Sequence, residues 1–96
     1  MFTSSALERA KTDLYNITAN LSYRDYYNAN FNKNGKRKSK KHIPYSLSQE
    51  TLDALEIYKM VYGKQSEQIT EEQEDQIKGY LLPIRTHRRE LLENVK

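Results

Sequence analysis

The feature that most constrains the fold is a run of apolar residues spaced alternately three and four positions apart near the start of the chain. The residues are Leu7, Ala10, Leu14, Ile17 and Leu21. Because an α-helix completes a turn every 3.6 residues, this spacing places all of them on one stripe of a single helix. Ser5 followed by Glu8 is a capping-box pattern. We therefore predict a helix that begins at Ser5 and extends to about residue 21.

The following segment, residues 22–31, carries two competing signals. Aromatic residues recur at every fourth position and favour a continued helix; they are Tyr23, Tyr27 and Phe31. Apolar residues also alternate with asparagines there, and the Asn34-Gly35 pair is typical of a two-residue β-hairpin turn. Residues 36–41 lack the apolar alternation of a partner strand, so we favour helix and expect residues 32–45 to form a basic loop or an irregular hairpin.

A helix is predicted to begin shortly after Pro44. Ser46 or Ser48 is the expected N-terminal cap. Gly63 is the expected stop, because glycine adopts the left-handed backbone that often follows a helix. The predicted buried face of this helix consists of Leu52, Leu55, Tyr58 and either Val61 or Tyr62.

The last helical region is predicted to begin after Thr70, which has the capping-box spacing with Gln73. An apolar stripe follows, made of Ile77, Leu81, Ile84, Leu91 and Val95. Pro83 lacks the backbone N–H that a helix interior uses, so it predicts a kink or a division into two helices. The fold class is therefore predicted to be all-α: a small bundle of three to five helices, arranged as helical hairpins, with a projecting basic loop.

Length and composition limit the chain to one domain with a lean core. Only 20 of the 96 residues are Leu, Ile, Val or Phe, which is close to the ~20% level below which chains fail to bury enough surface. We expect a single domain over residues 1–96, with a helical segment at 5–31, the basic loop at 32–45 and further helices at 46–96. A homo-oligomer, or a partner that covers the apolar faces, would add stability that so small a core lacks.

Several residue types that define compartments and cofactor sites are scarce. The chain has no cysteine, and therefore no disulfide and no thiolate ligand for zinc. Charged residues interrupt the first twenty positions, and no run approaches the ~18 apolar residues of a membrane span. We expect a cytoplasmic protein, or a nuclear one if the source is eukaryotic. With only His42 and His87 as histidines and no phosphate-binding glycine loop, we expect neither a metal, a cofactor nor an enzymatic activity.

Charge is segregated along the chain, although the net charge is only +3. Residues 21–49 hold seven basic residues and one acid, a net charge of +6, whereas residues 50–82 hold three basic residues and eight acids, a net charge of −5. Residues 36–41 are the densest part, with five cations in six positions. Because a partner senses charge within a Debye length of ~8–10 Å, these local values matter more than the total.

The basic segment predicts a nucleic-acid-binding module directed by charge and shape more than by base sequence, with DNA or RNA as the partner. The expected phosphate contacts are Lys36, Arg37, Lys38, Lys40 and Lys41. Tyr26 or Tyr45 is expected to stack on a base, and Arg88 and Arg89 are expected to assist. The ordinary alternatives are a solvated loop, tyrosines that fill a leucine-poor core, and a C-terminal solvent face balanced by Glu90 and Glu93.

An acidic cluster at the start of the last helical region predicts a different function. It consists of Glu71, Glu72, Glu74 and Asp75. These carboxylates would imitate phosphates in a protein-binding inhibitor or adaptor, such as a phage- or plasmid-encoded blocker of a defence nuclease. A helical scaffold or assembly protein is a further alternative. The ordinary interpretation is a solvated helix start, where carboxylates favour the helix dipole.

Overall fold

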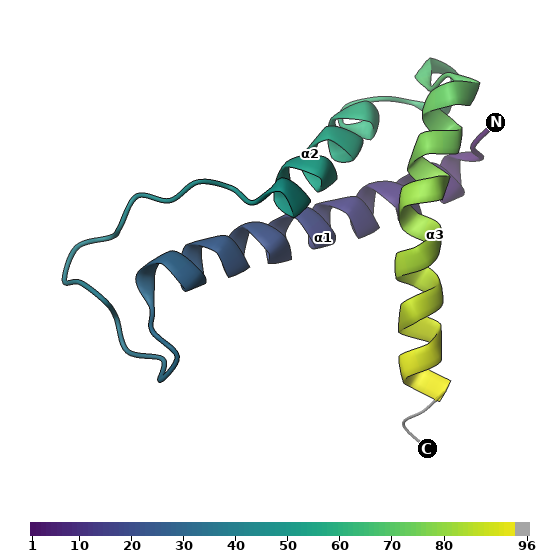
Figure 1. Ribbon diagram of the computed structural model, residues 1–96. Helices are drawn as coiled ribbons and strands as arrows, with labels where there is room; N and C mark the ends of the chain where they lie inside the picture. Colours follow the sequence, from purple (N-terminus) through teal and green to yellow (C-terminus); the bar gives the residue numbers. More distant parts are fainter. Residues whose placement is uncertain (94–96) are drawn as a thin grey trace.

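Three α-helices and one short 3-10 helix make up the described part of the chain. The computed structural model describes residues 1–93, with side chains described as far as Arg89. The elements are α1 (Ser4–Asn30), α2 (Gln49–Val61), η1 (Ser66–Gln68) and α3 (Glu71–Glu93). No β-strand occurs within residues 1–93, and the long loop between α1 and α2 is present (Figure 1). The predicted all-α fold is confirmed.

Helix α1 begins earlier and ends later than its apolar stripe alone predicts. The cap is Thr3, whose Oγ1 accepts a hydrogen bond from the Ala6 N–H at 3.1 Å, so the predicted cap at Ser5 is wrong. The reason lies in Phe2, which precedes the cap and belongs to the same buried cluster as Leu7. This is the spacing of a hydrophobic staple, which fixes how the chain enters a helix.

The helix continues without a break through residues 22–30, as the aromatic spacing favours. It ends at Phe31, where the backbone becomes extended.

Helix α2 runs back along α1 to form a helical hairpin (Figure 1). Its N-terminal cap is Ser48, one of the two predicted residues. The backbone at Gly63, the predicted stop, is left-handed, with φ at 69°. The predicted burial of Leu52 is wrong, because its side chain is 41% exposed. Thr51, which is 1% exposed, faces α1 instead.

A carboxylate on α1 explains this orientation of α2. Asp25 Oδ2 accepts hydrogen bonds from the Ser48 N–H at 2.9 Å and from the Thr51 hydroxyl at 2.7 Å. These bonds, the Ser48 N–H first, hold the pKa of Asp25 below its ordinary value. Arg24 beside it donates to Glu50 and to the Ser48 hydroxyl. Asp25 therefore sets the rotation of α2 and turns Leu52 towards solvent.

Helix α3 is a single helix despite the proline inside it. The predicted capping box is confirmed: Thr70 Oγ1 accepts from the Gln73 N–H, and Gln73 Oε1 accepts from the Thr70 N–H, each at 3.1 Å. The alternative of two helices separated at Pro83 is wrong. Pro83 has no backbone N–H to donate to the Gly79 carbonyl. Both residues lie on the exposed side of the helix, where water can form a hydrogen bond with that carbonyl.

The core lies where the three helices meet. The buried cluster consists of Phe2, Leu7, Ala10, Leu14, Val61, Ile77 and Leu81. Within the described residues, no helix is both long enough and apolar enough to cross a membrane. The predicted stripe positions Leu91 and Val95 lie outside the residues whose side chains are described.

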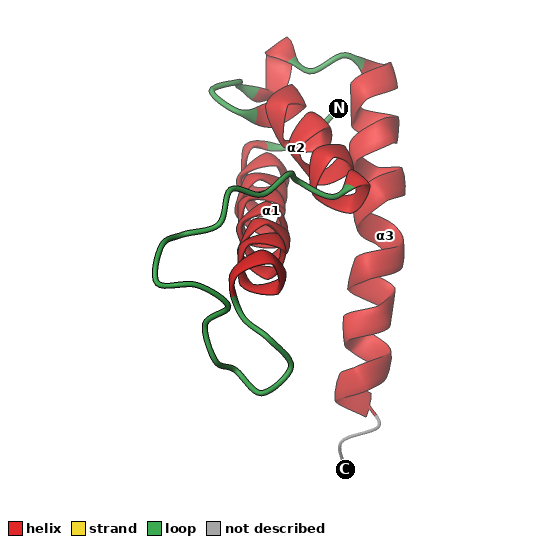
Figure 2. Ribbon diagram, turned by 60° about the vertical axis from the view of Figure 1, so that its left-hand side comes forward, coloured by secondary structure: helices red, strands yellow, loops and turns green. Residues whose placement is uncertain are grey.

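The overall shape is open. The molecule measures 49 × 37 × 19 Å and has a radius of gyration of 16.4 Å, compared with about 13 Å for a compact domain near 100 residues. Helix α3 crosses the N-terminal half of α1 and continues beyond it, while the C-terminal half of α1 carries the loop away on another side (Figures 1 and 2). Two arms therefore extend from one small core.

Candidate nucleic-acid interface

The base of the long loop is fastened to the end of α1 by Asn30. This side chain is 2% exposed. Its Oδ1 accepts from the Ile43 N–H at 2.6 Å, and its Nδ2 donates to the Ile43 carbonyl at 3.3 Å and to the Tyr26 carbonyl at 3.1 Å. The Lys38 N–H also donates to the Asn30 carbonyl at 2.8 Å. One asparagine therefore holds both the outgoing and the returning parts of the loop.

The first part of the loop forms the irregular hairpin that the Asn-Gly pair predicts. Asn32 Oδ1 accepts from the N–H groups of Asn34 and Lys36 at 2.9 and 3.1 Å. Gly35 has a φ of 79°, the left-handed region that this turn requires. A single antiparallel bridge joins Phe31 to Arg37. The turn therefore has defined hydrogen bonds, without developing strands.

The cations of the loop are exposed and have no acidic partner within the described residues. The five predicted phosphate contacts at 36–41, and Lys33 before them, are all solvent-exposed. None of them takes part in an ion pair among the described side chains. Lys38 Nζ donates to the Asn28 carbonyl at 3.0 Å, and Arg37 lies 3.1 Å from His42 Nδ1 and over the Phe31 ring. These neutral contacts orient two of the cations without cancelling their charge.

Aromatic rings gather beside the loop, around Tyr26. The Tyr26 ring centroid lies 6.2 Å from that of Phe31, 5.6 Å from that of His42 and 5.9 Å from that of Tyr45. Its hydroxyl is hydrogen-bonded to His42 Nδ1 at 2.9 Å. Tyr26 is half-buried among these neighbours, whereas Tyr45 is 42% exposed. Of the two tyrosines predicted to stack on a base, Tyr45 has the more accessible ring.

Two residues that the sequence analysis did not assign to the site also lie here. Tyr23 is 63% exposed and stands at the end of a row of rings on α1, next to Tyr27, which is stacked on Phe31 at 4.7 Å between centroids. Lys33 lines a hollow of about 360 Å³ together with Tyr27, Phe31 and Lys38. The four-residue spacing of the rings predicts that Tyr23 shares a helix with Tyr27, but its exposure depends on how α1 packs.

Arg88 and Arg89 lie apart from the loop, in a groove between α1 and α3. The groove has a volume of about 540 Å³ and is lined by Arg9, Asp13, Leu82, Arg85, Thr86, Arg88 and Arg89. Arg85 donates from Nε and Nη2 to Asp13 Oδ2 at 3.0 and 2.9 Å. The structure therefore brings the predicted arginines together with Arg85 of the same helix and with Arg9 of α1.

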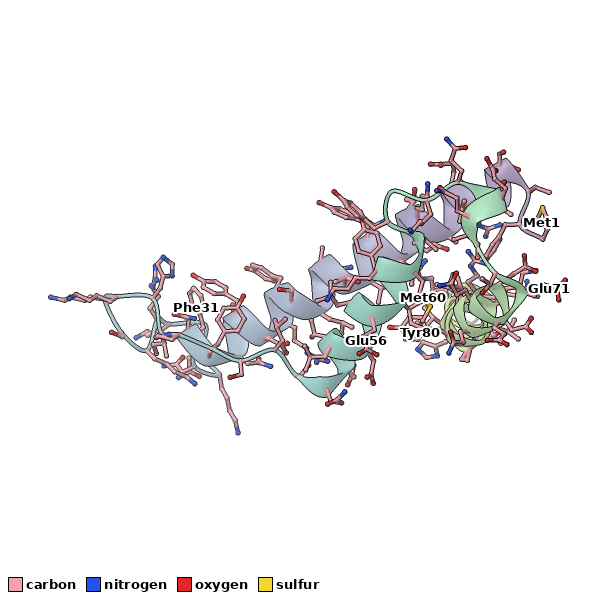
Figure 3. All side chains as sticks on the ribbon, turned by 90° about the horizontal axis from the view of Figure 1, so that it is seen from above. Met1, Phe31, Glu56, Met60, Glu71 and Tyr80 are labelled. Atoms are coloured by element: carbon pink, nitrogen blue, oxygen red, sulfur yellow. The ribbon has the colours of Figure 1, made fainter. Side chains whose placement is uncertain are left out.

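The acidic cluster is exposed in part. Glu71, Glu72 and Asp75 are exposed near the start of α3 (Figure 3 labels Glu71). The side chain of Glu74 is only 12% exposed, because it lies 3.0 Å from Lys78 Nζ and 3.2 Å from the terminal amino group of Met1. The hydrogen bond from Lys78 lowers the pKa of Glu74. Three of the four predicted carboxylates are therefore exposed to solvent.

Among residues 1–89, whose side chains the structure describes, no three His, Asp or Glu side chains lie close enough together to hold a metal ion. No known family model matches the chain, and no curated protein or solved structure is significantly similar to it. The geometry and charge of the loop and the groove are therefore the observations that bear on function.

Proposed function

We propose that this protein is a non-enzymatic nucleic-acid-binding module and that the basic loop at residues 32–45 is its contact surface. The observation that carries the proposal is the set of exposed cations at 36–41, which have no carboxylate partner within the described residues. Crowded cations repel one another, and an external anion relieves that repulsion. A phosphate backbone supplies anions at a regular spacing.

Counterion release gives the proposal a quantitative consequence. Five phosphate contacts correspond to a slope of about −4 to −5 in a plot of log affinity against log salt concentration. Affinity would then fall roughly 500-fold between 50 and 200 mM salt. A surface that binds through apolar contacts alone would show almost no slope.

The rings beside the loop favour unpaired bases. Stacking of one base on an aromatic side chain contributes about 1–3 kcal/mol. Tyr45 and Tyr23 are the exposed rings of the cluster, at 42% and 63%. The unpaired bases of a single strand can stack on these rings, whereas the paired bases inside a duplex cannot. We therefore expect single-stranded probes to bind more tightly than duplexes of equal charge.

Fluorescence anisotropy with single- and double-stranded probes at 50 and 200 mM salt tests the proposal. The double variant Lys40→Glu, Lys41→Glu removes two loop cations, and Lys59→Glu, Lys64→Glu is the matched control. Lys59 and Lys64 are exposed, lie outside the loop, and undergo the same change of charge. The loop variant should lose about two units of salt slope, and the control should lose little. Equal losses would show that net charge alone attracts the probe.

A second candidate function rests on the exposed acids of α3. Glu71, Glu72 and Asp75 are arranged to meet a basic surface of another protein, as in an inhibitor or adaptor of a nucleic-acid-processing complex. Absence of binding to any probe at 50 mM salt would favour this candidate over the first.

A further inference from the structure

We infer that the arginine groove between α1 and α3 is a second phosphate-binding surface, so that one molecule bridges two segments of nucleic acid. This inference rests on the proposed function of the loop. It assigns to Arg88 and Arg89 a role separate from that loop.

The first argument is the charge of the groove. Arg9 on α1 and three arginines on α3 line it, against the single carboxylate of Asp13. Leu82 and Thr86, the remaining lining residues, are uncharged. The lining therefore has a net charge of +3 among side chains that the structure describes. A hollow of one sign of charge concentrates anions at its surface.

The second argument is the orientation of the guanidinium groups. Asp13 and Arg85 are 17% and 34% exposed, and their two short hydrogen bonds fix the Arg85 side chain across the helix pair. Arg88 is held more loosely, 3.9 Å from Asp13, and is 51% exposed. Arg9 and Arg89 are exposed and make no ion pair among the described side chains. Arginine suits this role because its planar fork matches the geometry of a phosphate.

The third argument is the separation of the groove from the loop. The loop and α3 lie at opposite sides of the molecule in both Figure 1 and Figure 3. Figure 3 shows Glu56 of α2 between them, and Glu50 and Asp53 on the same helix are also exposed. These carboxylates repel a backbone that would pass from one basic surface to the other. Two separate segments avoid that repulsion.

A bridging assay with 10-bp duplexes tests the inference. Each duplex is about 34 Å long, which is shorter than the 49 Å axis of the molecule. One duplex is attached to beads, and protein is added with a second, fluorescent duplex. Retained fluorescence measures bridging, and sedimentation of protein with excess duplex measures how many duplexes one chain holds. The wild-type chain should hold two.

Three double variants separate the surfaces. Arg9→Glu, Arg89→Glu reverses charge on both walls of the groove and leaves the Asp13–Arg85 contact intact. Lys40→Glu, Lys41→Glu weakens the loop, and Lys59→Glu, Lys64→Glu is the control. Groove and loop variants should each lose about tenfold or more of the retained fluorescence while still binding one duplex. Circular dichroism is measured for each variant to check that it remains helical.

The outcomes distinguish this inference from the proposed function. Binding of one duplex without retention of a second overturns the inference and leaves the function of the loop standing. If no duplex binds, the inference is overturned; if single-stranded probes also fail to bind, the function of the loop is overturned as well. Bridging that is unchanged in the groove variant also overturns the inference. In that case self-associated copies would each bind one duplex through the loop. If a polyglutamate peptide competes for the groove as well as a duplex does, the inference is overturned. The ligand of the groove would then be an acidic protein segment and not a phosphate backbone.

Discussion

Replacement of Asn30 by alanine tests whether the loop is held in place by one side chain. The asparagine makes two hydrogen bonds to Ile43 across the base of the loop. Each contributes about 0.5–1.5 kcal/mol net, and the better helix propensity of alanine returns up to about 0.7 kcal/mol. We therefore expect Asn30→Ala to lower the free energy of loop opening by about 0.3–3 kcal/mol.

Hydrogen exchange of the Lys38 amide is the appropriate measurement. This N–H donates to the backbone carbonyl of residue 30, which the substitution leaves in place. Its exchange should become about 2- to 140-fold faster. Asn20→Ala is the control, because Asn20 is exposed on the same helix. An unchanged exchange rate at Lys38 would refute the argument that Asn30 orders the loop, and a faster rate in the control as well would implicate α1 in general.

Further predictions concern the core, the α1–α2 contact and the rings. Ile77→Ala removes a side chain that is 0% exposed and should lower the free energy of unfolding by about 2–5 kcal/mol in urea denaturation. Leu82→Ala, at a position that is 66% exposed, should change this free energy by less than about 0.5 kcal/mol. Equal losses for the two variants would contradict the described core. Because the Ser48 N–H lowers the pKa of Asp25 below 3.8, the stabilisation from this carboxylate is complete above that pH and is lost as the pH falls through the lower, folded-state value. Urea denaturation between pH 2 and 6 should therefore show a loss of stability on acidification that Asp25→Asn reduces, and an unreduced loss would count against it. Tyr45→Ala should weaken single-stranded binding by about 1–3 kcal/mol with little effect on duplexes, and an equal loss for both probes would argue against base stacking.

The sequence predicted the features that depend on neighbouring residues. The helical stripes, the Thr70–Gln73 capping box and the turn at Gly35 all depend on backbone geometry over a few positions. That geometry is set locally, so a pattern of residue types is enough to identify it. The exposed charge of the loop belongs to the same class, because six consecutive polar residues have no means of burial.

Local patterns failed where a distant residue decided the outcome. Thr3 caps α1 in place of the predicted Ser5, because burial of Phe2 in the core fixes where the helix begins. The apolar stripe of α2 predicted that Leu52 is buried, and this was wrong because Asp25 sets the rotation of that helix. In each case a tertiary contact was stronger than a preference that the sequence expresses within one turn.

The chain by itself determined that the fold consists of three to five amphipathic helices and that a strongly basic loop follows the first. Only the tertiary structure decided that Arg85 meets Asp13, 72 positions earlier, and that Arg88 and Arg89 line a groove away from the loop. The physical reason is that helical periodicity specifies which side chains share a face. Which faces meet depends on how the small core packs and on the few polar contacts that orient one helix against another.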